Sequence, residues 1–280
     1  MGIVGCLDSA PSVDENTPAP LTESIGNSST VEPARDTDSN EELERPERVD
    51  TGKSSDLLDD AGEEDTVDTG PPRRENSSVR VYKVTSSEEL CGGIGSQARV
   101  DGAWVVENEV ARFYIQDTGV AAGLDLYGGN VIDAVRLDEA GNPGPDLFRE
   151  MFPIVGFKVP DAQEIVLDWD EKGHPVLRVI GTDQLSNVVD LLDSLVAGPA
   201  GLEIETEYGM EPGIPALRVQ TRIRWPKDAQ KTILLVGELL AFGKYQQVFT
   251  EEGGFGEPVD LANLEALVTQ AEGASYGWVQ

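Results

Sequence analysis

The chain has very few of the residues that carry nucleophilic or metal chemistry. Its 280 residues include one histidine and two cysteines, and no apolar run is long enough to cross a bilayer. Cys6 and Cys91 give neither a disulfide framework nor the spacing of a zinc site, so Cys91 is expected to be a small buried side chain. No Ser/His/Asp or Cys/His set can form without using His174, the single histidine.

Basic residues are also scarce, with 21 Lys and Arg against 52 Asp and Glu, which gives a net charge of −31. Residues 1–78 contain 20 acidic and six basic residues, and the remainder contains 32 and 15. An acidic surface of this size repels phosphate backbones and anionic lipid headgroups. We therefore expect no nucleic-acid partner, and membrane contact only through a lipid anchor.

The composition changes near Val79 and predicts three segments, 1–6, 7–78 and 79–280. Segment 7–78 is rich in Asp, Glu, Ser, Thr and Pro and has almost no aromatic residues, so it cannot bury enough apolar area to fold. We predict a disordered acidic linker, with a partner-binding acidic tail as the alternative. The last segment is long enough for one folded domain with a sizeable core.

The tetrapeptide Ile3-Val4-Gly5-Cys6 is similar to the lipobox of bacterial lipoproteins, in which the cysteine receives diacylglycerol. Followed by a solvated stalk, it predicts lipidation of Cys6 and display on the bacterial cell envelope, towards the periplasm or the exterior. A signal peptide needs an apolar segment of about 7–15 residues before cleavage, and only five residues precede Cys6. The prediction therefore requires a start upstream of Met1, and the alternative is a chance match.

Alternating apolar and polar residues predict a mainly β domain, an antiparallel β-sandwich with one or two short helices. Thr232–Leu240 is nearly all apolar and predicts a central strand covered on both faces. Helical spacing predicts helices over Leu185–Val196 and Leu261–Val268. The other predicted strands are Val79–Val84, two within Ala103–Gln116, Asn130–Asp138, Ile165–Asp170, Val176–Ile180, and a last strand from Ser275 that is cut short at the carboxyl end.

A charged hairpin is the clearest structural prediction. Leu202–Tyr208 alternates apolar residues with glutamates, and Leu217–Trp225 alternates apolar residues with polar ones, mostly arginines. Joined through the turn Met210–Gly213, the two strands place one face in the core and set opposite charges against each other on the other face. We interpret these arginines as ladder partners of exposed glutamates rather than as an anion-binding site.

The order of these motifs resembles a known family. The motifs are Val106-Glu107-Asn108, Arg112–Ile115, Gly128–Asp133, Gly144–Glu150 and Glu205–Pro212. Over Cys91–Gln280 the chain resembles the amino-terminal β domain of bacterial lipoproteins that also carry a metal-dependent phosphoesterase-like hydrolase domain. More distantly, it is similar to the galactose-mutarotase-like supersandwich. The resemblance implies a sandwich fold, with any hydrolase half beyond Gln280 or on another polypeptide. Val135 departs from the pattern, which favours an acidic residue there.

Few residues are candidates for a site, and we assign none as catalytic. His174 lies in a polar Gly-His-Pro turn and is predicted to be a solvent-exposed turn residue. Asp138, Glu139, Asp146 and Glu150 share a turn-rich segment and are the candidate ligands of a calcium ion, although acidic residues are common throughout. Candidate glycan-binding residues are Tyr127, in a glycine-rich loop, together with Asp133, Asp146 and Glu150. Asp168, Asp170 and Glu171 are interpreted as a solvated turn.

The sequence is compatible with three functions, and it favours a non-enzymatic role over an enzymatic one. The first is a non-catalytic, surface-tethered β-sandwich module of an envelope lipoprotein, with a glycan as its candidate ligand. The second is an accessory part of a metallohydrolase whose catalytic domain lies elsewhere. The third is a structural spacer or protein-interaction module. Ligand identity and oligomeric state are left open.

Overall fold

The computed structural model describes residues 2–7, for which only the backbone is considered, 78–93, 95–120, 123–156, 158–185, 198–226, 236–242, 247–250, 254–255, 265–271 and 274–279. All of them belong to one compact unit, made of Met1–Ala10 and Thr69–Gln280. The predicted stalk lies outside the described residues except for Leu7 and Ser78, and so does the helix predicted after Leu185. Among the described residues, no helix has the length and apolar character needed to cross a membrane.

The described residues form antiparallel β structure, as predicted, with a short 3-10 turn (η1) at Ser87–Glu89. The strands are β1 Gly2–Leu7, β2 Arg80–Lys83, β3 Ala103–Glu107, β4 Ala111–Gln116, β5 Val131–Arg136, β6 Phe148–Val155, β7 Lys158–Trp169, β8 Pro175–Leu185, β9 Glu203–Met210, β10 Ala216–Arg224, β11 Val236–Phe242, β12 Gln247–Thr250, β13 Gly254–Phe255, β14 Ala266–Ala271 and β15 Ala274–Val279.

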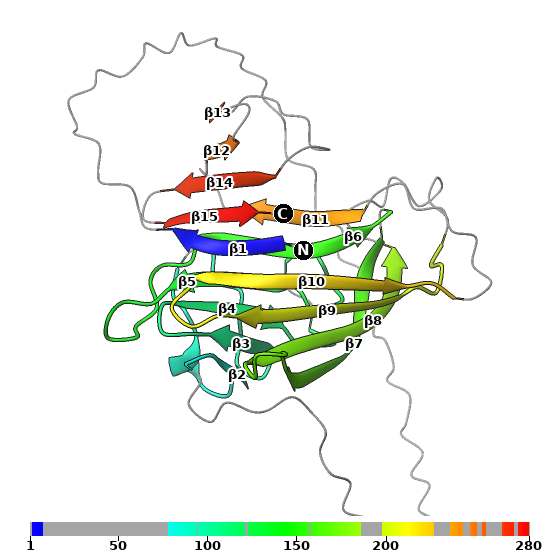
Figure 1. Ribbon diagram of the computed structural model, residues 1–280, viewed down its shortest axis with the longest axis horizontal. Helices are drawn as coiled ribbons and strands as arrows, with labels where there is room; N and C mark the ends of the chain where they lie inside the picture. Colours follow the sequence, from blue (N-terminus) through cyan, green and yellow to red (C-terminus); the bar gives the residue numbers. More distant parts are fainter. Residues whose placement is uncertain are drawn as a thin grey trace, which may run out of the picture. The chain divides into compact units, whose positions relative to one another are not determined.

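The strands follow the chain in order over most of the fold. Ten strands, β2 to β11, are connected by pairing, with β2 to β10 running in sequence and β11 paired to β6. β15, β14, β12 and the two-residue β13 form a carboxy-terminal sheet. β1 joins these two parts because it pairs with β10 on one side and with β15 on the other (Figure 1). The sequence did not predict a strand at Gly2–Leu7.

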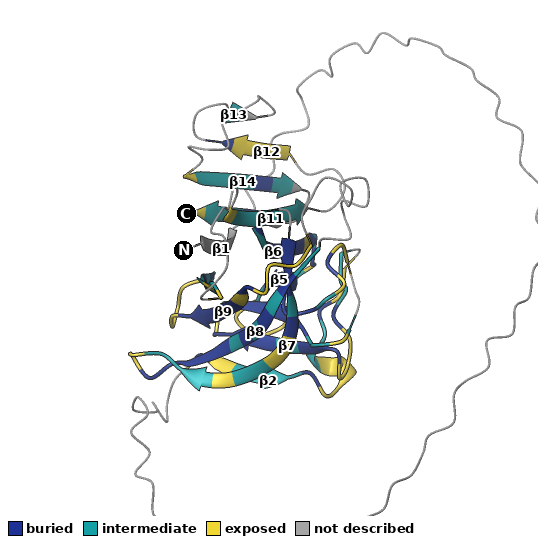
Figure 2. Cartoon of the chain, turned by 90° about the vertical axis from the view of Figure 1, so that its right-hand side faces the viewer, coloured by how far each residue is buried: buried dark blue, intermediate teal, exposed yellow. Residues whose placement is uncertain are grey.

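The main core lies where β3 and β4 face β8, β9 and β10. Phe113 and Ile115 of β4 pack in one cluster with Leu177 of β8, Tyr208 of β9 and Leu217 of β10, all fully buried. The opposite face of β4 is also covered, since Tyr114 belongs to a second cluster that combines residues of β3 and β5 with Val84, Cys91 and Ala98 from the segment that follows β2. This explains why every residue of β4 is buried, whereas the strands of the carboxy-terminal sheet are mostly half-buried or exposed (Figure 2).

A glycine and a buried asparagine hold two of the turns against the core. Gly129 has a φ of 78°, and a Cβ there would collide with the side chain of Val179, so only glycine fits this position. Asn108 is buried at the β3–β4 turn, where its Oδ1 accepts the N–H groups of Val110 and Ala111. Its Nδ2 donates to the carbonyls of Glu211 and Ile214, at 2.7 and 2.8 Å, and thereby ties this turn to the β9–β10 turn.

Two predictions of secondary structure were wrong. The described part of the predicted Leu261–Val268 helix is strand β14, in which Leu267 pairs with Trp278 and Val268 with Gly277. Cross-strand partners far along the chain outweigh the local helical spacing there, and the β-branched Val268 suits a strand. The run to Leu240 ends in β11, which pairs with β6 alone among the described strands and leaves Val236 exposed. It is therefore not a central strand covered on both faces.

Candidate functional site

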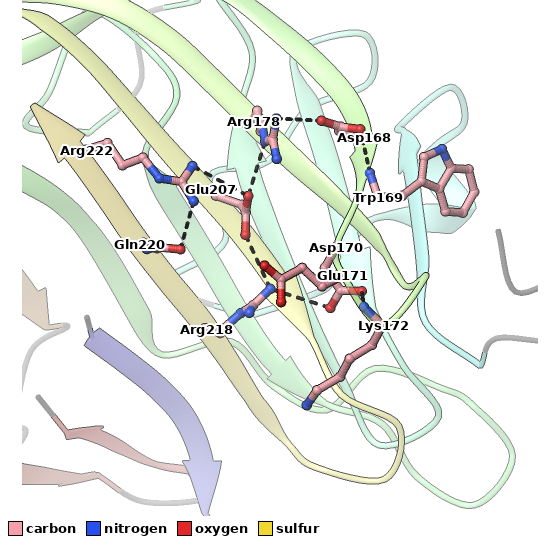
Figure 3. A pocket seen from close by; sticks show the side chains of 10 residues that line it. All are labelled: Asp168, Trp169, Asp170, Glu171, Lys172, Arg178, Glu207, Arg218, Gln220 and Arg222. Atoms are coloured by element: carbon pink, nitrogen blue, oxygen red, sulfur yellow. Dashed lines mark hydrogen bonds and ion pairs between the residues drawn. The ribbon is translucent and has the colours of Figure 1, made fainter. Parts of the chain in front are cut away.

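A polar pocket lies on the face formed by β7, β8, β9 and β10. Its volume is about 550 Å³, and charged side chains dominate its lining (Figure 3). The lining residues are Asp168, Trp169, Asp170, Glu171, Lys172, Arg178, Glu207, Arg218, Gln220 and Arg222.

β9 and β10 form one wall of this pocket. They pair as the predicted charged hairpin, so the predicted pairing of these two strands is confirmed. Glu205 is the register partner of Arg222, and their Oε1 and Nη1 atoms lie 2.7 Å apart. Glu203 is the partner of Arg224 and forms an ion pair with it. These pairs arise because the alternation that buries Ile204 places its neighbours on the opposite face of the sheet.

The network extends beyond the hairpin to β8 and β7, which the sequence analysis did not anticipate. Arg178 of β8 is the register partner of Glu207, with Nε 3.1 Å from Oε2, and its Nη1 lies 2.6 Å from Asp168 Oδ2. On the other side, Arg218 Nη2 lies 3.3 Å from Glu207 Oε1 and 3.6 Å from Asp170 Oδ2. Glu207 thus lies between two arginines (Figure 3).

The acidic residues of this network are much less exposed than the sequence predicted. The side chains of Glu205 and Glu207 are only 11% and 6% exposed, because the arginines on both sides cover them. Arg178 and Arg218, by contrast, are each 32% exposed, so their guanidinium groups remain partly open to the pocket. A buried carboxylate between partly exposed arginines is stabilised by their charge in place of the water that it has lost.

The end of β7, with Asp168 and Trp169, and the turn that follows it contribute the rest of the pocket. The turn interpretation of Asp168, Asp170 and Glu171 is incomplete, because all three line the pocket. Asp170 Oδ1 accepts the N–H groups of Lys172 and His174, at 2.9 and 2.8 Å, and so fixes the turn. Trp169 lines the pocket as well, but its indole ring points away from the ion pairs (Figure 3).

His174 is buried, with 4% of its surface exposed, so the predicted exposed turn histidine is wrong. The tight turn explains this, since Asp170 N–H donates to the His174 carbonyl at 2.9 Å and draws the residue inwards. Lys172 and Arg178, which precede and follow His174 in the sequence, line the pocket, but His174 itself does not. The arrangement does not favour a catalytic role for this imidazole.

A second polar cluster is buried between Cys91, Asp133 and Asp146. Asp133 accepts the N–H of Ala98 at 2.6 Å, and the Cys91 thiol donates to its Oδ2 over 3.8 Å. Asp146 Oδ1 accepts the N–H groups of Ala134 and Phe148, at 3.1 and 3.3 Å, whereas its Oδ2 is buried without a hydrogen-bond partner among the described residues. Burial raises the pKa of Asp146 to about 8, with the charge of Asp133 adding to the effect, and burial raises the pKa of Asp133 to about 6.

This cluster also explains the glycines at positions 93 and 95. Added Cβ atoms there would come within 2.6 Å of the Asp146 carbonyl oxygen and within 2.7 Å of its Oδ2, respectively. Burial raises the pKa of the Cys91 thiol to about 12, which leaves it protonated and unreactive. Cys91, Asp133 and Asp146 are all buried, and we interpret the cluster as structural.

The predicted calcium ligands do not come together. Asp138 is exposed and accepts the N–H of Asn142 at 2.8 Å, and Glu139 lies beside it in the same exposed turn. Asp146 is buried with Asp133, and Glu150 accepts Asp125 N–H at 2.9 Å. Among the described residues, no three His, Cys, Asp or Glu side chains are arranged to hold a metal ion. The shared turn-rich segment was misleading because Asp138 and Glu139 are exposed in a turn, whereas Asp146 and Glu150 are buried.

The predicted glycan residues are likewise separated from the pocket. Asp133, Asp146 and Glu150 are buried, and Tyr127 is half-buried with its hydroxyl donating to the Leu185 carbonyl at 3.1 Å. They therefore do not form an open binding surface. The signal that could have found the pocket is Arg178, an arginine at a polar position of a strand that neighbours the glutamate strand.

Cys6 lies in β1, where it is the register partner of Tyr276. Lipoprotein processing removes the residues before the modified cysteine, and these include all four residues of β1 that pair with β10. Lipidation of Cys6 therefore stays a prediction. A chain processed and lipidated at Cys6 would lack the residues of β1 that pair with β10. The mass of the mature amino terminus distinguishes such a chain from an unprocessed one.

Comparison with protein-family models, with curated proteins and with solved structures found no match to this chain. The lipoprotein and supersandwich resemblances accordingly stay predictions.

Proposed function

We propose that the chain is a non-catalytic binding module and that the pocket on β7 to β10 takes a neutral saccharide. The observation that carries the proposal is the internal charge balance of the pocket. Its cations are Lys172, Arg178, Arg218 and Arg222, and its anions are Asp168, Asp170, Glu171 and Glu207.

This balance argues against an anionic ligand. Arg178 and Arg218 already share Glu207, and Arg222 pairs with Glu205, so a phosphate or carboxylate would compete with bonds already made. A neutral polyol faces no such competition. Its hydroxyls can donate to carboxylate oxygens and accept from guanidinium N–H groups whose partners are fixed in advance.

The same geometry sets the expected strength of binding. The Trp169 ring points away from the ion pairs, so the contact would rest on hydrogen bonds rather than on stacking over an aromatic face. Hydrogen bonds that replace bonds to water contribute about 1 kcal/mol each. We therefore expect dissociation constants in the range of roughly 0.1–10 mM for a mono- or disaccharide.

The sandwich topology of the supersandwich type belongs to this proposal. It is supported by the core between β3–β4 and β8–β10 and by the Asn108 turn, which matches a motif of the resemblance. In that context a polar pocket on an outer sheet face suits an accessory or display module. Attachment to the envelope through Cys6 is a separate prediction.

The test is binding of neutral mono- and disaccharides and of sulfated counterparts, followed by NMR or by tryptophan fluorescence. The variants Lys172→Ala and Gln220→Ala remove polar groups of the pocket, and each should weaken binding of the neutral sugar. Arg224→Ala is the matched control, since Arg224 pairs with Glu203 on the same hairpin but does not line the pocket. Preference for the sulfated sugars, or equal binding by all three variants, would contradict the proposal. Absence of any sugar binding would favour the spacer function.

A further inference from the structure

β1 lies inside the sheet, between β10 and β15, although both partners are more than 200 residues away in the sequence. Residues 8–79 separate it from β2, yet β1 pairs on both edges (Figure 1). Gly2 to Gly5 pair with Val219 to Ala216 of β10, and Ile3 to Leu7 pair with Val279 to Ser275 of β15. Because two of its six residues are glycine, main-chain pairing contributes much of its binding.

The two walls of the slot that holds β1 are fixed independently of it. β10 pairs with β9 from Leu217–Met210 to Arg224–Glu203. β15 pairs with β14 and is also tied to β6, because the Tyr276 hydroxyl accepts the N–H groups of Leu147 and Phe148 at 2.9 and 3.0 Å. Trp278 Nε1 further donates to Glu238 of β11 at 2.5 Å.

Removal of β1 would therefore leave a groove rather than a collapsed sheet. Its two edges would each expose unpaired N–H and C=O groups, which is the arrangement that accepts an added strand. The groove fits a strand of the sequence and length of Gly2–Leu7, since it already holds one.

We propose that this groove accepts residues Gly2–Leu7 of a second copy of the chain, so that the protein forms strand-exchanged dimers. The contacts in the groove are the same whether β1 comes from its own chain or from another, so only the connection differs. The cost of closing a loop rises slowly with its length, but residues 8–79 make a long one, and their composition predicts a solvated chain. The effective concentration of β1 at its own groove is then about millimolar or below, and exchange competes at protein concentrations near that value.

The decisive experiment is a disulfide between two differently substituted copies of the full chain, both with Cys6→Ser. One carries Ile3→Cys and the other Val279→Cys, because Ile3 and Val279 are register partners and Val279 is 48% exposed. Antiparallel partners lie about 4.5–5.5 Å apart at Cα, which a disulfide can bridge. The copies are unfolded together in urea, refolded at about 1 mM total protein and oxidised. Cys91 remains in both copies as a buried thiol.

The expected product is a disulfide-linked heterodimer. The matched control replaces Val279→Cys by Val248→Cys, since Val248 is 40% exposed on β12, which pairs with β13 and β14. The Ile3–Val279 product should exceed this control roughly ten-fold at 1 mM and fall towards it at about 10 µM. Val4→Pro should remove the dimer, because proline cannot complete the pairing of an inner strand, whereas Ser12→Pro, outside β1, should not.

A single chain with both Ile3→Cys and Val279→Cys separates the possible failures. If it forms an internal disulfide at 10 µM while the mixed copies never exceed the Val248→Cys control, the groove is real but the exchange proposal is wrong. If neither arrangement forms the disulfide, the placement of β1 between β10 and β15 is itself overturned. Both results leave the saccharide pocket on β7 to β10 untouched, so the two proposals can fail separately.

Discussion

Removal of the charge of Glu207 is the sharpest test of the ion-pair network. Its side chain is 6% exposed, and its oxygens lie 3.1, 3.3 and 3.8 Å from nitrogens of Arg178, Arg218 and Arg222, respectively. The variant Glu207→Gln keeps the size of the side chain but leaves these arginines without their shared anion.

The expected cost follows from the exposure of both partners. Loss of one member of a fully buried pair typically destabilises a protein by about 3–5 kcal/mol. Arg178 and Arg218 are each 32% exposed, so water can solvate them after the substitution. We therefore expect Glu207→Gln to lower the free energy of unfolding by about 2 kcal/mol.

The same hairpin offers a matched control in Glu203→Gln. Glu203 pairs with Arg224, and the two side chains are 51% and 57% exposed. An exposed pair contributes about 0–1 kcal/mol, so this variant should be close to neutral. The assay is urea unfolding followed by tryptophan fluorescence and circular dichroism. With a slope of about 2 kcal/mol per molar, Glu207→Gln should lower the midpoint by about 1 M. Equal midpoints for the two variants would refute the distinction between buried and exposed pairs.

Further predictions concern pH, the Asn108 turn and catalysis. The raised pKa values of Asp146 and Asp125, about 8 and 7, mean that the folded state binds more protons than the unfolded state above pH 4. Stability should therefore fall as pH rises from 5 to 8, and urea midpoints should fall less in Asp146→Asn. A pH profile unchanged by this substitution would contradict the raised pKa of Asp146. Asn108→Ala removes the side-chain donor to the carbonyls of Glu211 and Ile214 and the acceptor of two N–H groups in its own turn. It should cost about 2–4 kcal/mol in unfolding free energy, against a near-neutral Asn142→Ala in the exposed turn. The isolated chain should show no mutarotation or phosphodiester hydrolysis, with or without divalent metal, and turnover lost in His174→Ala would overturn the non-catalytic proposal.

The parts of the fold that could be predicted are those governed by local alternation. The strands that became β3, β4, β5, β9 and β10 were predicted from their sequence patterns, most clearly from the alternation of apolar and polar residues in β9 and β10, although nearly every residue of β4 and β9 proves to be buried. The Glu–Arg pairing followed from the same period. β14 and β1 could not be predicted, because their stability comes from partners far along the chain rather than from their own pattern.

The site was less predictable than the fold for a related reason. Arg178 and Asp168 are ordinary charged residues in sequence, and only the register of β7, β8 and β9 lets Arg178 pair with both Asp168 and Glu207. Conversely, Asp138 and Asp146 are near neighbours in sequence but end in an exposed turn and a buried cluster, respectively. Proximity along the chain was therefore a poor guide to proximity in space.

The pairing of β1 with β15 has a consequence for how the protein is made. Ile3 precedes its partner Val279 by almost the whole sequence, so the ribosome releases β1 long before either wall of its slot exists. Such distant pairing raises the contact order of the fold and slows its formation. β1 has no partner until β10 is made and completes its pairing only after β15, which exposes its short apolar stretch to other nascent chains during that interval.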